Sequence, residues 1–260
     1  MQIVQLYLPS FLLVLCRITS FFVTAPLFSF RNVPTMFKAG LGAFVSMIVL
    51  SAMEGGAGAV VFDAGYPLLI MREILVGLML GFAAYLFFTV VQVAGAFMDY
   101  LIGFGMANVI DPMTGAHSPL LGNFKFFVAL LLFLSMNGHH QLLLGIMRSY
   151  EWIPLDNRFF SRLADGSVFQ FILDTFVRTF YLAFQMAAPI IVAIFLVDVG
   201  LGVLARVASQ FNMFVVGLPI KILVGFIVLL LIVPGMLYLY RDMFEGMIAA
   251  MRRLLELAGA

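Results

Sequence analysis

Long uncharged segments constrain this chain more than any other feature. Residues 74–98 carry no charged side chain over 25 positions, and residues 126–147 carry none over 22. Residues 179–197 and 222–240 are further uncharged runs of 19 residues each. The hydrocarbon core of a bilayer is about 30 Å thick, and a helix needs about 20 residues to cross it. Each run therefore predicts a membrane-type helix.

Two shorter or less regular apolar segments precede these four. Residues 4–30 form the first, which contains Arg17, and residues 40–53 form the second. The 260-residue chain is 64% apolar and 10% charged, whereas a soluble domain is roughly 45–50% apolar and about 25% charged. We therefore predict an all-α membrane-type protein with about six long hydrophobic helices in hairpins.

The connection GFGMANVIDPMTGAHSPLLG, residues 103–122, fits neither a helix nor an ordinary solvated loop. Its glycines and prolines disfavour a helix, and non-helical backbone at membrane depth persists only where protein buries it or water lines it. One interpretation is an interfacial loop whose apolar residues enter the headgroups. The other is a re-entrant segment that plugs a pore and blocks ions by dewetting.

The plug interpretation assigns the constriction to one short stretch of this loop. Its apolar side chains would seal the pore, and Asn108 and Asp111 would bind the loop's own backbone, as Asn and Asp do in turns. The predicted plug residues are Phe104, Met106, Asn108, Val109, Ile110, Asp111, Pro112 and Met113.

The sequence lacks the patterns typical of catalytic and metal sites. The three histidines occur in no HExxH or Cys/His pattern, no serine has a GxSxG context, and Cys16 is the single cysteine. The net charge of +1 indicates no basic surface for nucleic acid. We expect no enzymatic activity, no metal and no cofactor.

Ionisable residues within or beside the apolar runs are the remaining polar candidates: Arg17, Glu54, Arg72, Glu73, Asp99 and Asp198. Charges at membrane depth are costly and usually have partners. We expect Arg17, Arg72, Glu73 and Asp198 to be paired at contacts between helices or subunits. The alternative, a proton or ion relay, would need acids stacked on one helix face, and none of these recurs at i, i+4.

Several motifs together resemble a known family. GFGMANVIDPMTG, FLSMNGHHQLLLGIMRSYEWIPL and the earlier RITSFFVTAPLFSFRNVP are similar to the FliR family of flagellar type III export-gate proteins, over essentially the whole chain. Homologues in virulence secretion systems share the fold, and the Asn-Gly-His-His element at 137–140 favours the flagellar branch. The C-terminal third is similar to the small two-helix export protein FliQ, through residues 187–189, 210–214 and 219–222.

The resemblance implies a FliP-like portion over residues 1–165, containing the plug loop 103–122, and a FliQ-like hairpin with a C-terminal tail over residues 166–260. It also implies assembly with FliP-like and FliQ-like subunits, and contact with other export-apparatus membrane proteins. The assembly would form a closed channel for unfolded flagellar proteins, located in the bacterial inner membrane at the flagellar basal body. We expect a partner-facing turn formed by Gln210, Asn212, Pro219 and Lys221. The rival class is a small-molecule transporter or channel with a re-entrant binding loop.

Overall fold

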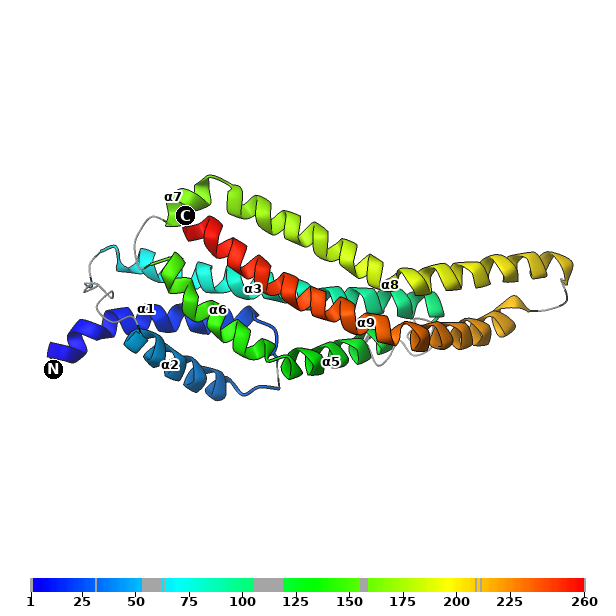
Figure 1. The fold of residues 1–260 in the computed structure, drawn as a ribbon, viewed down its shortest axis with the longest axis horizontal. Coiled ribbons are helices and arrows are strands. Elements are labelled where there is room, and N and C mark those ends of the chain that lie inside the picture. The colour runs from blue at the N-terminus through cyan, green and yellow to red at the C-terminus, as the bar shows by residue number, and fades with distance from the viewer. Residues whose placement is uncertain are drawn as a thin grey trace. The chain divides into compact units, whose positions relative to one another are not determined.

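The computed structural model describes residues 2–30, 32–52, 62, 64–104, 119–154, 159–208, 210 and 212–259, and within these ranges all regular structure is helical (Figure 1). The helices are α1 (Gln2–Thr24), α2 (Thr35–Ala52), α3 (Tyr66–Ile102), α5 (Leu120–Ser135), α6 (Gly138–Trp152), α7 (Phe159–Ala164), α8 (Ser167–Val207) and α9 (Met213–Gly259). Helix α9 continues to Gly259, well past the uncharged run that ends at residue 240.

Five helices are long and apolar enough to cross a membrane: α1, α2, α3, α8 and α9. The consecutive helices α5 and α6 pass the same criterion only when they are taken together, as one span broken between Ser135 and Gly138. The all-α membrane-type fold with about six long hydrophobic helices is therefore confirmed.

The prediction of a single helix over residues 126–147 is wrong, because the helix is interrupted between Ser135, where α5 ends, and Gly138, where α6 begins. Asn137 adopts φ 57°, in the left-handed region that few non-glycine residues occupy, and its carbonyl accepts hydrogen bonds from the first turn of α6. The break contains no charged residue, so an uncharged run could not reveal it.

The described helices group into two compact units. The first comprises Met1–Phe87, Met136–Phe176 and Glu245–Ala260, and the second comprises Phe88–Ser135 and Val177–Phe244. Helices α3, α8 and α9 each contribute to both units. This spatial grouping differs from the division after residue 165 that the resemblance implies, and that division stays a prediction.

The first unit is built on close approach of α1 and α3. A Cβ atom on Gly77 would clash with the side chain of Ser20, and one on Gly81 would clash with that of Thr24. Small residues four apart on one helix let a second backbone approach closely. The α1 side chains beside this contact, Phe21 and Phe22, are buried.

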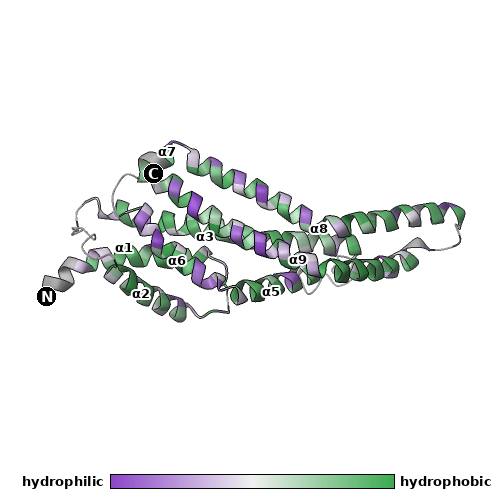
Figure 2. Cartoon of the chain, viewed as in Figure 1, coloured by the Kyte–Doolittle hydropathy of each residue, from purple (hydrophilic) through white to green (hydrophobic). Residues whose placement is uncertain are grey.

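The second unit has an aromatic core and a long hairpin. Phe88 of α3, Phe133 of α5 and Phe244 of α9 pack with ring centroids 5.0–5.7 Å apart. The α8–α9 hairpin in this unit carries hydrophobic residues along both helices, whereas hydrophilic residues gather in the C-terminal part of α9, within the first unit (Figure 2). Many hairpin side chains are exposed, including Phe195, Leu230 and Leu231. Apolar surface of this extent marks contact with lipid or with another protein.

Candidate functional site

Both ends of the predicted plug loop lie among the described residues, in the second unit. Phe104 is described, whereas the predicted plug residues Met106, Asn108, Val109, Ile110, Asp111, Pro112 and Met113 lie outside the described ranges. The last three residues of the predicted loop, 120–122, are the first turn of α5 and not loop.

Helix α3 ends at Ile102 and is followed by Gly103, the first residue of the predicted plug loop. Gly103 has φ 102°, a conformation that glycine adopts without the steric cost of a Cβ atom. The backbone N–H groups of Gly103 and Phe104 both donate to the carbonyl of Asp99, at 3.2 and 3.0 Å. This is the glycine-based ending common at helix C-termini.

The side chain of the same aspartate fastens the start of α5. Asp99 Oδ1 accepts from the Leu121 N–H at 3.0 Å, and Oδ2 accepts from the Gly122 N–H at 3.2 Å. First-turn N–H groups have no partner within their own helix, and a carboxylate there also interacts favourably with the helix dipole. Asp99 therefore binds the backbone on both sides of residues 105–118.

The two helices touch through glycines one turn from this aspartate. A Cβ atom on Gly95 would overlap Gly122 Cα and would lie 2.7 Å from Gly122 N. We call Gly95, Asp99, Gly103, Leu121 and Gly122 the loop anchor.

Two further side chains support the loop anchor. Lys125 is only 3% exposed, and its Nζ donates to Met98 Sδ at 3.4 Å. Phe104, the first predicted plug residue, packs edge-on against Phe226 of α9 with ring centroids 6.0 Å apart. Hydropathy did not single out Lys125. The sequence did carry a signal for Asp99: it is an acid directly after the apolar run that ends at residue 98. Pro119, directly before α5, marks where the next helix begins.

The predicted partner-facing turn is smaller in the structure. Gln210 and Asn212 lie between α8 and α9 and are exposed, and the Asn212 carbonyl accepts from the first turn of α9. Pro219 and Lys221 lie inside α9 instead. Lys221 Nζ lies 2.6 Å from Asp198 Oδ1 on α8. Asp198 is thus paired between the two helices of the hairpin, and its placement at a subunit contact stays a prediction.

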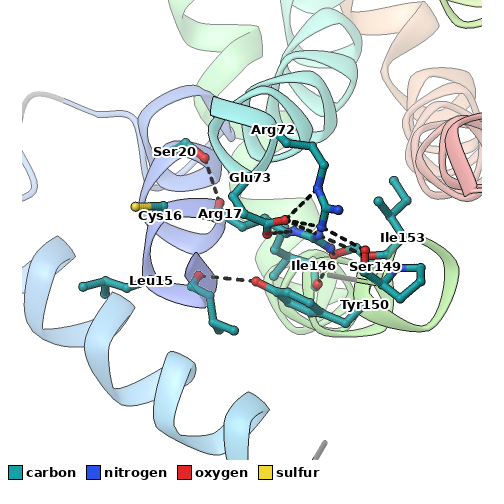
Figure 3. Close-up of polar contacts among 12 residues, drawn as sticks. Leu15, Cys16, Arg17, Ser20, Arg72, Glu73, Ile146, Ser149, Tyr150 and Ile153 are labelled. Atoms are coloured by element: carbon teal, nitrogen blue, oxygen red, sulfur yellow. Dashed lines mark hydrogen bonds and ion pairs between the residues drawn. The ribbon is translucent and has the colours of Figure 1, made fainter. Parts of the chain in front are cut away.

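The other predicted intramembrane charges form one buried cluster in the first unit (Figure 3). Arg17 Nε and Nη2 donate to the two carboxylate oxygens of Glu73 at 2.6 and 3.0 Å. Arg72 Nη2 donates to Glu73 Oε1 at 2.6 Å. All three side chains are 0% exposed. They pair with one another between helices inside the chain, and a contact of this cluster with another subunit stays a prediction.

The cluster holds two arginines and one glutamate, and both arginines also donate to carbonyls at the end of α6. Arg17 Nη2 donates to the Ile153 carbonyl at 3.0 Å, and Arg72 Nη2 donates to the Pro154 carbonyl at 2.8 Å. The Tyr150 ring lies under Arg17, 3.9 Å from Cζ to the centroid. Carbonyl groups at a helix C-terminus carry partial negative charge that favours cations. The end of α6 therefore helps to stabilise the second positive charge, which Glu73 alone does not neutralise.

Replacing Asp99 with alanine is expected to destabilise the protein by about 1–3 kcal/mol, because two buried N–H groups lose their acceptor. Hydrogen exchange at the Leu121 and Gly122 amides should accelerate. Asp99→Asn retains one side-chain oxygen acceptor and should keep part of the protection. Unchanged exchange in Asp99→Ala would contradict the anchoring role.

Among the described residues no group of three or more His, Cys, Asp or Glu side chains could hold a metal ion. The predicted absence of metal and cofactor stays a prediction.

Comparison with known proteins identifies the class of chain that carries this site. The family model described as bacterial export proteins, family 1, matches residues 8–247. The chain belongs to this family.

Relatives named FliR match most or nearly all of the chain's length. The flagellar biosynthetic protein FliR of Bacillus subtilis is 46% identical over 99% of this chain and 98% of its own. The FliR protein of Pectobacterium carotovorum is 30% identical over 84% of this chain and 82% of its own. That of Escherichia coli is 28% identical over 85% of this chain and 82% of its own. The resemblance to the FliR family is confirmed, and with it a role in flagellar biosynthesis and protein export.

Proposed function

We propose that this chain is a subunit of the flagellar export gate, where it contributes wall helices and the plug of a channel for unfolded flagellar proteins. The observation that carries the proposal is the loop anchor, in which Asp99 binds the backbone of residues on both sides of the segment 105–118. A segment fastened in this way between membrane-type helices is suited to hold a fixed constriction. Membership in the export family favours this function over a small-molecule transporter.

We infer that FliP-like and FliQ-like subunits, together with other export-apparatus membrane proteins, are the partners. The exposed apolar side chains of α8 and α9 support this, since a channel wall needs neighbours on such faces. Gln210 and Asn212 at the hairpin turn are the polar residues placed to contact a partner at that end. The proposed location is the bacterial inner membrane at the flagellar basal body.

Replacing Phe104, Met106, Val109 and Met113 together with glycine is expected to make the assembled gate conduct small ions. The seal depends on apolar side chains that exclude water from the constriction. Conductance of the purified gate in planar bilayers measures the leak, with secretion of flagellar proteins as a parallel readout.

The matched control keeps the four positions apolar, as Phe104→Leu, Met106→Leu, Val109→Ile and Met113→Leu. This variant should stay closed to ions, since bulk and polarity are nearly retained. A gate that remains ion-tight with four glycines, while assembling normally, would contradict the plug.

A further inference from the structure

A groove of about 690 Å³ lies between α6 and the C-terminal part of α9, entirely within the first unit. Its floor is apolar, with Met251 and Leu255 buried and Leu144 and Ile248 partly covered. Gly145 contributes no side chain to this floor, and a Cβ atom there would lie 3.1 Å from Met251 Cε. The volume of the groove gives room for an apolar chain, and beside Gly145 the floor is closed by Met251.

The rim of the groove carries charges that the chain does not pair. Arg148, Glu151 and Arg252 are exposed, and none forms a hydrogen bond or ion pair with a residue that the structure describes. In contrast, Arg253 Nη1 lies 2.9 Å from Glu256 Oε2. The lining as a whole carries three arginines and three glutamates, so it has no net charge. Because Arg253 is paired with Glu256 and Glu245 is also engaged, the rim groups left without a partner among the described residues are two guanidinium groups and one carboxylate, which suits a ligand with an anionic phosphate.

The combination of floor and rim fits a phospholipid. Guanidinium groups bind phosphate through paired hydrogen bonds, and basic pockets between membrane helices bind lipid headgroups. Trp152, 40% exposed beside the groove, is the residue type enriched at the membrane interface. Helix α9 is a candidate membrane span, and α6 is half of the broken α5–α6 pair that passes the same criterion, so lipid is a neighbour available to this groove.

The volume of the groove is that of a small-ligand pocket. Such pockets measure about 300–1,000 Å³, and the groove lies within this range. We propose that the groove holds the phosphate of a phospholipid between Arg148 and Arg252, with an acyl chain over Met251 and Leu255. This site goes beyond the proposed export function and does not depend on it.

Native mass spectrometry of the full chain, purified with its co-expressed partners and stripped of lipid in detergent, tests the site. Titration with phosphatidylglycerol should give one bound lipid in the wild type. The double variant Arg148→Gln/Arg252→Gln should bind it at least about tenfold more weakly, since two charge-assisted contacts are lost. Arg253→Gln is the matched control and should stay within about twofold, because Glu256 already engages Arg253.

A second variant leaves the charges intact and fills the floor. Gly145→Leu should also weaken lipid binding, while circular dichroism and the subunit composition of the complex stay unchanged. Equal lipid binding by the wild type and the Arg148/Arg252 double variant would overturn the proposal. Retention of inorganic phosphate in place of lipid would overturn it, as would loss of a partner subunit with bound lipid unchanged.

Discussion

Replacing Glu73 with leucine is expected to destabilise this protein by about 3–5 kcal/mol, a large share of the roughly 5–15 kcal/mol by which folded proteins are stable. The substitution leaves Arg17 and Arg72 buried with no counter-charge, and both are 0% exposed. Burial of a charge without its partner is among the costliest single changes in a protein. Thermal unfolding of the detergent-purified complex, together with the yield of assembled chain, measures the effect.

A matched control uses the exposed pair on α9. Glu256→Gln removes the partner of Arg253 where both side chains meet solvent, and such pairs contribute about 0–1 kcal/mol. A triple replacement of Arg17, Arg72 and Glu73 with methionine removes every charge of the cluster and should be more stable than Glu73→Leu alone. If Glu73→Leu unfolds at the wild-type temperature, the cluster does not hold α1, α3 and α6 together.

Replacing Gly95 with alanine is expected to force α3 and α5 apart. The added methyl group would overlap the Gly122 backbone, which cannot move aside as a flexible side chain can. Overpacking costs about 1–3 kcal/mol, and separation would also remove the Asp99 bonds to Leu121 and Gly122, at about 1–3 kcal/mol more. Unfolding temperature reports the first effect, and exchange of the Leu121 and Gly122 amides reports the second.

The control for this substitution lies in the same unit. Gly235 of α9 has no atom within 4 Å of an added Cβ. Alanine there should be neutral or stabilising by up to about 1 kcal/mol, because alanine favours helix over glycine. Equal behaviour of Gly95→Ala and Gly235→Ala would contradict the close helix contact at the loop anchor.

The uncharged apolar runs predicted which segments are helices well, because charged side chains are costly within membrane-type helices and so are rare there. The same criterion could not locate their ends, and α8 and α9 continue well past the uncharged runs at 179–197 and 222–240. The uncharged run also did not reveal the break between α5 and α6. A left-handed backbone conformation such as that of Asn137 does not change the hydropathy of the sequence.

The sequence predicted which charges need partners but not which partners they have. Arg17 and Glu73 are 56 residues apart in the chain, and their pairing depends on how α1 and α3 are rotated about their axes. Asp99 reaches the start of α5 over 22 and 23 residues. Such capping across helices leaves no local pattern, unlike a cap within one helix.

The lengths of α8 and α9 limit how much of this chain a bilayer can surround. Their 41 and 47 residues correspond to about 62 Å and about 70 Å at 1.5 Å per residue, against a hydrocarbon thickness of about 30 Å. The bilayer therefore covers only part of each helix, and apolar turns beyond it require a sheath of other protein. Insertion into the bilayer therefore covers only some of the apolar helix surface of this chain, and contact with other protein has to cover the rest.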